Sequence, residues 1–248
     1  MRTSVQLYSV REALAADPRA TLTALREQGF EHVEPFGLLD WAERLRPLLP
    51  ELGLTAPSTH ASVIDAEDPA RLFGVAAELG VGTVIDPYRD REQWTSVEGV
   101  ERTADLLNSL ADAAQSAGVR IGYHNHEFEV QTDLEGRTGL EVLAAALDPR
   151  IVLEVDTFWV AVGGQDPARL LRALGQRVQL AHLKDGPLNR ETALQTPIGQ
   201  GEMDVPAILE AAPWLEYGVI EFDDYTGDVL DGIRQSREAL GRLQSNGE

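Results

Sequence analysis

Three ionisable residues interrupt apolar stretches in the second half of the chain. Asp156 closes the run IVLEVD, His182 lies within QLAHL, and Glu221 lies within GVIEF. Burying such a group costs free energy unless the group is paired, protonated or bound to a metal. A divalent cation would offset this cost, because one imidazole with two or three carboxylates suits Mn²⁺, Mg²⁺, Co²⁺, Zn²⁺ or Fe²⁺. A structural ion pair explains each residue alone, but their recurrence at matching positions of consecutive runs favours a metal site.

The stretch IGYHNHEFEV, residues 121–130, is a second place where reactive side chains gather. His124 and His126 are two residues apart, so an extended chain would direct both to the same side. Glu154 stands in the same relation to Asp156. An ordinary polar turn is the alternative for the two histidines.

Four further residues are candidate substrate contacts, and each has a structural alternative. Glu34 could instead act as a cap or pair with an arginine, and His60 could be a loop histidine. Lys184 could bind an anionic or hydroxyl group, or it could be solvated at the end of a strand. Trp159 could stack on a sugar ring or pack in the core.

The loop GQGEMD, residues 199–204, has two glycines and precedes a run that Asp204 could cap as a helix. Such a loop can cradle a phosphate. The pattern is unspecific, so we favour a lid or a plain turn. Only Lys184 and Arg190 lie near the candidate residues in the sequence, which leaves open whether the substrate carries a phosphate.

The elements that must position these residues alternate along the chain. Short apolar, β-branched runs predict strands at residues 4–9, 32–36, 54–60, 83–88, 120–126, 151–158, 178–185 and 218–224. Amphipathic runs between them predict about as many helices. This alternation fits a single-domain (β/α)8 TIM barrel over residues 1–248, in which chemistry takes place at the C-terminal ends of the strands. A doubly wound open sheet is the alternative, but no glycine-rich phosphate loop follows the first run.

Helix boundaries carry their own signals. Asp-Pro pairs predict capped helix starts at Asp17, Asp68 and Asp166. Thr95 and Glu98 have the spacing of a capping box ahead of a long helix. Glycines at the position just beyond a helix end are expected at Gly29, Gly80 and Gly118.

Composition narrows the class of protein. The formal net charge of −20 disfavours nucleic acid and anionic membrane surfaces as partners. The chain has no cysteine, which excludes disulfides, a thiol nucleophile and a cysteine metal site. The start MRTSVQLYSV does not have the pattern of a leader, and no apolar stretch is long enough to span a bilayer, so we expect a cytoplasmic protein.

Five segments resemble one known superfamily, in the order in which that superfamily has them. They are YHNHEFEV (123–130), LEVDTFWV (153–160), AHLKDG (181–186), PIGQGEMD (197–204) and VIEFDD (219–224). The chain resembles the sugar phosphate isomerase/epimerase superfamily with a xylose isomerase-like TIM barrel. Its relatives include ketose 3-epimerases, hydroxypyruvate isomerases, inosose dehydratases and endonucleases of the type-four class.

The resemblance implies a metal site with one ligand from each of strands five to eight. Asp156, His182 and Glu221 take the places on strands six, seven and eight. The epimerases have a glutamate on strand five, where this chain offers Tyr123 or His124, depending on a one-residue shift. His124 is the chemically sensible substitute. Glu129 is similar to a later family glutamate near the substrate. The type-four endonucleases need a larger trinuclear zinc set, which five histidines and a net charge of −20 do not favour.

The resemblance implies an isomerase or epimerase of a small sugar, keto-sugar or polyol that works through an enediolate. The cation, with Mn²⁺ favoured, would bind the substrate oxygens, Glu221 would be base or acid, and His124 a ligand or the second proton carrier. Glu34, His60, His126, Glu129, Glu154, Trp159 and Lys184 are the expected substrate contacts.

Two alternatives remain open. A metal-dependent lyase would dehydrate an inosose or cleave a 3-keto-glycoside, which an imidazole in place of the glutamate would suit because it can protonate a leaving group. A non-catalytic sugar-binding barrel would keep His60 and Trp159 but need no metal. The sequence leaves the oligomeric state open, including a homo-oligomer.

Overall fold

Eight parallel strands form the centre of the molecule, as the computed structural model shows for residues 1–245, which are the residues it describes. The strands are β1 (Arg2–Gln6), β2 (His32–Glu34), β3 (Ser58–His60), β4 (Thr83–Asp86), β5 (Arg120–His124), β6 (Val152–Asp156), β7 (Val178–Leu183) and β8 (Tyr217–Ile220). Their order is β2-β1-β8-β7-β6-β5-β4-β3. The ring closes between β2 and β3, where His60 N donates to Pro35 O at 2.8 Å and Val33 N donates to Thr55 O at 2.9 Å.

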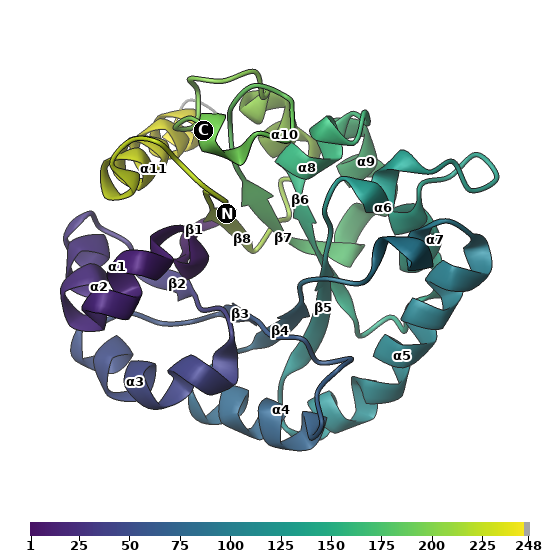
Figure 1. The fold of residues 1–248 in the computed structure, drawn as a ribbon, viewed down its shortest axis with the longest axis horizontal. Coiled ribbons are helices and arrows are strands. Elements are labelled where there is room, and N and C mark those ends of the chain that lie inside the picture. Colours follow the sequence, from purple (N-terminus) through teal and green to yellow (C-terminus); the bar gives the residue numbers. More distant parts are fainter. Residues whose placement is uncertain (246–248) are drawn as a thin grey trace.

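Helices surround this ring (Figure 1). The α-helices are α1 (Arg11–Ala16), α2 (Pro18–Glu27), α3 (Leu38–Glu51), α4 (Pro69–Glu78), α5 (Val97–Ser116), α6 (Phe128–Gln131), α7 (Gly139–Ala146), α8 (Thr157–Val162), α9 (Pro167–Leu174), α10 (Val205–Ala211) and α11 (Val229–Ser245). Short 3-10 turns are η1 (Leu7–Val10), η2 (Arg91–Trp94), η3 (Gly175–Arg177) and η4 (Thr192–Leu194). The predicted TIM barrel is confirmed.

All eight predicted strands exist, but several end earlier than predicted. The strand predicted over 151–158 ends at Asp156, because Thr157 starts α8. The Asp156 carboxylate accepts a hydrogen bond from Trp159 N at 2.9 Å and so caps this helix. His126, Lys184 and Glu221 likewise lie just beyond strand ends, in the connections that form the rim of the barrel.

Most of the predicted helix boundaries are confirmed. Asp17, Asp68 and Asp166 each accept a backbone N–H of the first helical turn. Gly29, Gly80 and Gly118 have φ values of 92°, 79° and 78°, which favour glycine.

The predicted cap at Thr95 is wrong. Ser96 caps α5 instead, and Gly99 N donates to Ser96 Oγ at 3.1 Å. Ser96 has the extended backbone that an N-cap needs, with φ −150° and ψ 157°. Thr95 still belongs to the end of η2, and its hydroxyl donates to Glu92 O at 2.8 Å.

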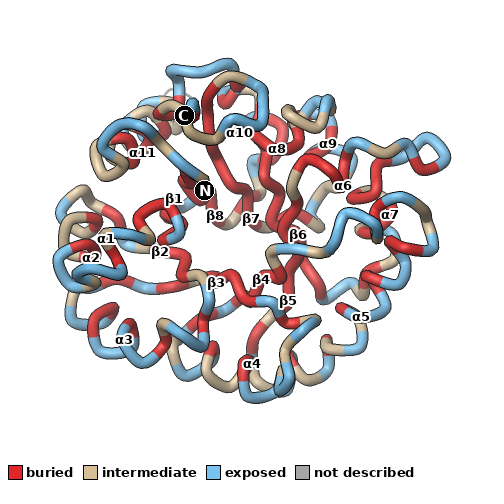
Figure 2. The backbone as a smooth tube through the Cα atoms, viewed as in Figure 1, coloured by how far each residue is buried: buried red, intermediate tan, exposed pale blue. Residues whose placement is uncertain are grey.

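Most residues of the strands are buried, and Figure 2 shows the central ring mainly in the colour of buried residues. Their outward side chains pack under the helices. Inside the barrel, a small apolar cluster comprises Ile85, Val152, Leu180, Tyr217 and Val219. Because side chains alternate along a strand, Val152 shares the inner face with Glu154 and Asp156. The apolar cluster therefore fills one end of the barrel, and the ionisable residues fill the C-terminal end.

No helix within residues 1–245 is both long and apolar enough to cross a membrane.

Candidate functional site

A cavity of about 620 Å³ lies at the C-terminal ends of the strands. Its lining includes Tyr8, Arg11, Phe36, His60, Tyr88, His124, His126, Glu221, Asp223 and Asp224. A cavity of this size suits a small organic ligand. Its position is the one at which TIM barrels place their chemistry.

Asp156, His182 and Glu221 meet at this end of the barrel. One ligand atom from each lies within 4.8 Å of the others, and all three residues are buried. Strand register brings them together, because Asp156 on β6 is the direct neighbour of His182 on β7. His182 Nδ1 lies 2.7 Å from Glu221 Oε2. Two carboxylates and one imidazole in this arrangement fit a divalent cation.

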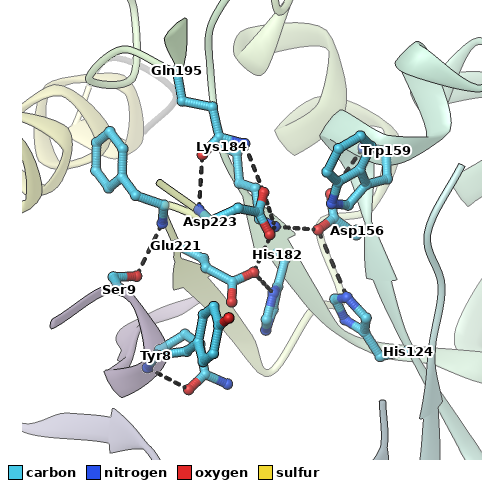
Figure 3. A network of polar contacts seen from close by, with 12 residues as sticks. Tyr8, Ser9, His124, Asp156, Trp159, His182, Lys184, Gln195, Glu221 and Asp223 are labelled. Carbon is cyan, nitrogen blue, oxygen red and sulfur yellow. Dashed lines mark hydrogen bonds and ion pairs between the residues drawn. The ribbon is translucent and has the colours of Figure 1, made fainter. Parts of the chain in front are cut away.

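Lys184 occupies the space between these carboxylates and is the single lysine of the chain. Its Nζ lies 2.6 Å from Glu221 Oε2 and 2.9 Å from Asp156 Oδ2. Asp223 contacts the same ammonium with both oxygens, at 2.9 and 2.8 Å. Figure 3 shows Lys184 between Asp223 and Asp156, with Glu221 and His182 beside it. The buried ammonium offsets part of the negative charge of these three carboxylates.

A second group of ionisable residues lies directly beside the first. Ligand atoms of His60, His124, Glu154 and His182 also lie within 4.8 Å of one another. Glu154 Oε2 is 2.6 Å from His60 Nε2, 3.1 Å from His182 Nε2 and 3.2 Å from His124 Nδ1. His182 belongs to both groups and presents one ring nitrogen to each.

Glu34 completes this second group from the opposite wall. Its Oε1 lies 2.8 Å from His182 Nε2 and also accepts Gln6 Nε2 at 2.8 Å, and its Oε2 accepts the Ser58 hydroxyl. Glu34 and Glu154 are fully buried and do not line the cavity. The structure therefore places them behind the histidines rather than at the surface that a substrate would touch.

Acceptor oxygens in these groups are left without a hydrogen bond. Glu154 Oε1 is buried and has no hydrogen-bond partner among the described residues. Asp156 Oδ2 has no well-aligned hydrogen bond either, although it lies 2.9 Å from Lys184 Nζ and 3.7 Å from His124 Nε2. Unpaired buried carboxylate oxygens are costly, so the donor set fits a bound cation.

Burial and neighbouring charges shift the pKa values of His124 and His182 in opposite directions. Burial and the positive charge of His182 hold the pKa of His124 well below its usual value. Burial alone would lower the pKa of His182, but the carboxylates of Glu154 and Glu221 outweigh it and raise that pKa well above the usual value. The surroundings therefore favour the neutral form of His124 and the protonated form of His182.

Two other predicted substrate contacts lie in or near the cavity wall. His126 lines the cavity, and its buried Nδ1 has no hydrogen-bond partner among residues 1–245. Burial, with the charge of Lys184, lowers the pKa of His126 to about 4. Trp159 is only 7% exposed and lies behind the wall, 5.7 Å from Lys184 Nζ and 6.4 Å from the His126 ring.

Glu129 lies away from the cavity lining. Tyr123 Oη donates to its Oε1 and His126 N to its Oε2, both at 2.9 Å. Burial raises the pKa of Glu129 to about 8. Its carboxyl group therefore shapes the turn that presents His126, and it does not belong to the groups formed by Asp156, His182 and Glu221 or by His60, His124 and Glu154.

Several residues of the cavity were not among the predicted contacts. Tyr8 and Arg11 follow β1, Phe36 follows β2, Tyr88 follows β4, and Asp223 follows β8. Tyr8 lies near the C-terminal end of the strand predicted over 4–9 and two residues after the observed end of β1, and this position is a signal that could have identified it. Arg11 carries no such signal, since it lies on a helix that only the fold turns toward the cavity.

A family model described as Xylose isomerase-like TIM barrel matches residues 22–243. The chain belongs to this family. The match covers all strands except β1, including the three that carry His124, Asp156 and His182 and the strand that Glu221 follows.

Three individual proteins show what the chain is similar to within this fold. An inosose dehydratase from Geobacillus kaustophilus (strain HTA426) is 31% identical over 118 residues, which are 46% of this chain and 37% of that protein. The match thus spans less than two thirds of the dehydratase's own length. A sugar phosphate isomerase/epimerase structure from Parabacteroides distasonis ATCC 8503 has a TM-score of 0.80 at 23% identity, covering 96% of this chain and 93% of that one. The structure of an IolI protein with a bound zinc atom has a TM-score of 0.75 at 16% identity and covers 99% of both chains.

Proposed function

We propose that the protein is a divalent-metal-dependent isomerase or epimerase of a small sugar, keto-sugar or polyol. The observation that carries this proposal is the convergence of Asp156, His182 and Glu221 beside a cavity at the C-terminal end of the barrel. These three residues would hold the metal, with His124 as the fourth ligand. Mn²⁺ is the favoured ion, and the zinc in a protein of the same fold supports a divalent cation.

The bound cation would act as a Lewis acid that stabilises the negative charge developing on a substrate oxygen when the neighbouring C–H bond loses its proton. Glu221 would take that proton, and its position in the cavity lining supports this role. Lys184 and His182 both contact Glu221 Oε2, so the carboxylate is held in one orientation. Its other oxygen is the one that we assign to proton transfer.

His124 lines the same cavity, and its ring centroid lies 4.5 Å from that of His182. It can serve as ligand or return the proton to the opposite face or to the next carbon. His60 and His126 would contact substrate hydroxyls from the same wall.

Elimination is the second candidate, and a specific observation favours it. The five curated sequence matches are all inosose dehydratases. In this reaction the base takes the proton beside the carbonyl, a C=C bond forms, and the β-C–O bond breaks. The leaving hydroxide takes a proton from an acid on the cavity wall and departs as water. A non-catalytic sugar-binding barrel would show neither reaction.

Proton exchange distinguishes these functions. The Mn²⁺-loaded protein is incubated in D₂O with ketoses, inososes and 3-keto-glycosides, and the products are followed by NMR. Deuterium entry with an altered sugar is expected for the isomerase or epimerase, and an unsaturated or cleaved product indicates the lyase. Glu221→Gln should abolish exchange, whereas Glu210→Gln, an exposed change on α10, should not. Full exchange in Glu221→Gln would contradict the role of Glu221. If sugars bind equally well in a chelator and no exchange occurs, the proposal that the protein is an enzyme is contradicted.

A further inference from the structure

We infer that the cavity takes an uncharged, unphosphorylated polyhydroxy substrate. This inference rests on the proposed function and narrows it to one substrate class. The groups that could bind a phosphate near the cavity are already occupied by carboxylates or carbonyls of the chain itself.

The glycine-containing loop at 199–204 is the first such group. The Asp185 carboxylate, 1% exposed, accepts Gly186 N at 2.8 Å, Gly199 N at 2.8 Å and Met203 N at 3.0 Å. A phosphate would need these same N–H groups. The N–H groups of this loop therefore already bind the Asp185 carboxylate, and the structure does not support the alternative that the loop binds a phosphate.

Lys184 is the second group. Its ammonium is fully buried and contacts Asp156, Glu221 and Asp223. Asp223 is not one of the candidate metal ligands and binds Nζ with both oxygens. The lysine therefore keeps a carboxylate partner even when Asp156 and Glu221 hold a cation, and it is not available to a phosphate.

The arginines near the cavity are also engaged. Arg11 Nη1 donates to Tyr8 O and to Asp223 O, both at 3.1 Å, and its guanidinium lies 4.4 Å from the Tyr8 ring centroid. Arg190 does not line the cavity, and its Nε lies 3.1 Å from Glu127. Gly37 at the start of α3 faces the cavity, but Asp40 supplies a negative charge in that first turn.

The residues that line the cavity also favour an uncharged ligand. Glu221, Asp223 and Asp224 present carboxylates to the cavity, and these would accept sugar hydroxyls but repel a phosphate dianion. Tyr8 and Tyr88 remain 41% and 46% exposed at the rim, and Phe36 lies 5.4 Å from Tyr8 between ring centroids. Aromatic faces beside carboxylates suit the C–H face and the hydroxyl edge of a sugar.

Paired substrates test this inference. Deuterium exchange and equilibrium binding are measured on the Mn²⁺-loaded protein for D-fructose, D-tagatose and an inosose, and for the phosphate ester of each. The uncharged parent should exceed its ester in kcat/KM and in affinity by about tenfold or more, the effect of roughly 1.4 kcal/mol of repulsion. Inorganic phosphate should not compete. Asp224→Lys should narrow the difference, and Glu210→Lys, the same charge change outside the cavity, should not.

The possible failures are distinguishable. An ester preferred over its parent, in exchange or in binding, would overturn this inference and leave the proposed function standing. Competition by inorganic phosphate at millimolar concentration would do the same. If no uncharged sugar binds or exchanges, and no ester does either, the inference fails together with the proposed function.

Discussion

The Lys184 ammonium lies 2.6 Å from Glu221 Oε2, in the middle of the carboxylates that we assign to a metal. The chain contains 21 lysines and arginines, and Lys184 is its only lysine. A compact ammonium can satisfy three carboxylates at once, whereas the planar, larger guanidinium of arginine requires a different geometry. The lysine is therefore an internal counterion for Asp156, Glu221 and Asp223.

Lys184→Met should destabilise the metal-free protein by about 3–5 kcal/mol, because it leaves buried carboxylates without a cation. Thermal unfolding in a chelator and again with Mn²⁺ measures this. The ion should raise the melting temperature of the variant more than that of the wild type. Arg46→Met, which removes an exposed pair with Glu78, is the control and should cost no more than about 1 kcal/mol. A metal-free Lys184→Met as stable as the wild type would refute the counterion role.

Glu154 orients the histidines from behind, so Glu154→Gln should weaken Mn²⁺ binding by about 10- to 100-fold. The amide lacks the negative charge that Glu154 Oε2 presents to the His60, His182 and His124 rings. Calorimetric titration with Mn²⁺ provides the dissociation constant, and circular dichroism checks that the variant is folded. Glu129→Gln alters another buried glutamate that contacts Tyr123, and it should leave Mn²⁺ affinity unchanged. Equal affinity in both variants would show that Glu154 has no positioning role.

Glu129 should make stability depend on pH. Burial raises the pKa of its carboxyl from 4.5 to about 8 in the folded chain. Between these values the folded chain holds a proton that the unfolded chain has released, so this group lowers stability as pH rises, by at most about 1.4 kcal/mol per pH unit, and the loss levels off above pH 8. Urea unfolding from pH 5 to 9 should show Glu129→Gln gaining stability relative to the wild type across this window. The exposed Glu210→Gln should show a flat difference, and a flat difference for Glu129→Gln would count against the prediction.

Gly201 should tolerate no side chain. A Cβ there would lie 2.2 Å from Asp185 Oδ1 and 2.2 Å from Gly186 N. Gly201→Ala must therefore displace the carboxylate that holds the 199–204 loop, and we expect a loss of about 1–3 kcal/mol from the freed buried groups. Gly241→Ala, in α11 with open space around its Cβ, should be neutral or stabilising by up to about 1 kcal/mol. Urea unfolding of the two variants compares them, and equal stability would contradict the packing argument.

The number and order of the elements could be predicted from the sequence because their signals are local. Apolar runs, Asp-Pro pairs and glycines beyond helix ends each depend on a few neighbouring residues. Strand ends were less predictable. The pattern IVLEVDTF predicts that the strand continues through Asp156. In the folded chain the Asp156 carboxylate instead caps a helix by accepting a hydrogen bond from Trp159 N, and no local pattern predicts that bond.

The sequence by itself determined the barrel and the presence of ionisable residues at the ends of its strands. Only the tertiary structure decided which of them meet. His182 joins Glu34 across 148 residues of chain, and His60 joins Glu154 across 94. The tertiary structure also decided that Glu129 accepts a hydrogen bond from Tyr123 and that the Asp185 carboxylate binds the backbone of the 199–204 loop. The physical reason is that strand register and ring closure fix these distances, and neither property is encoded within any one segment.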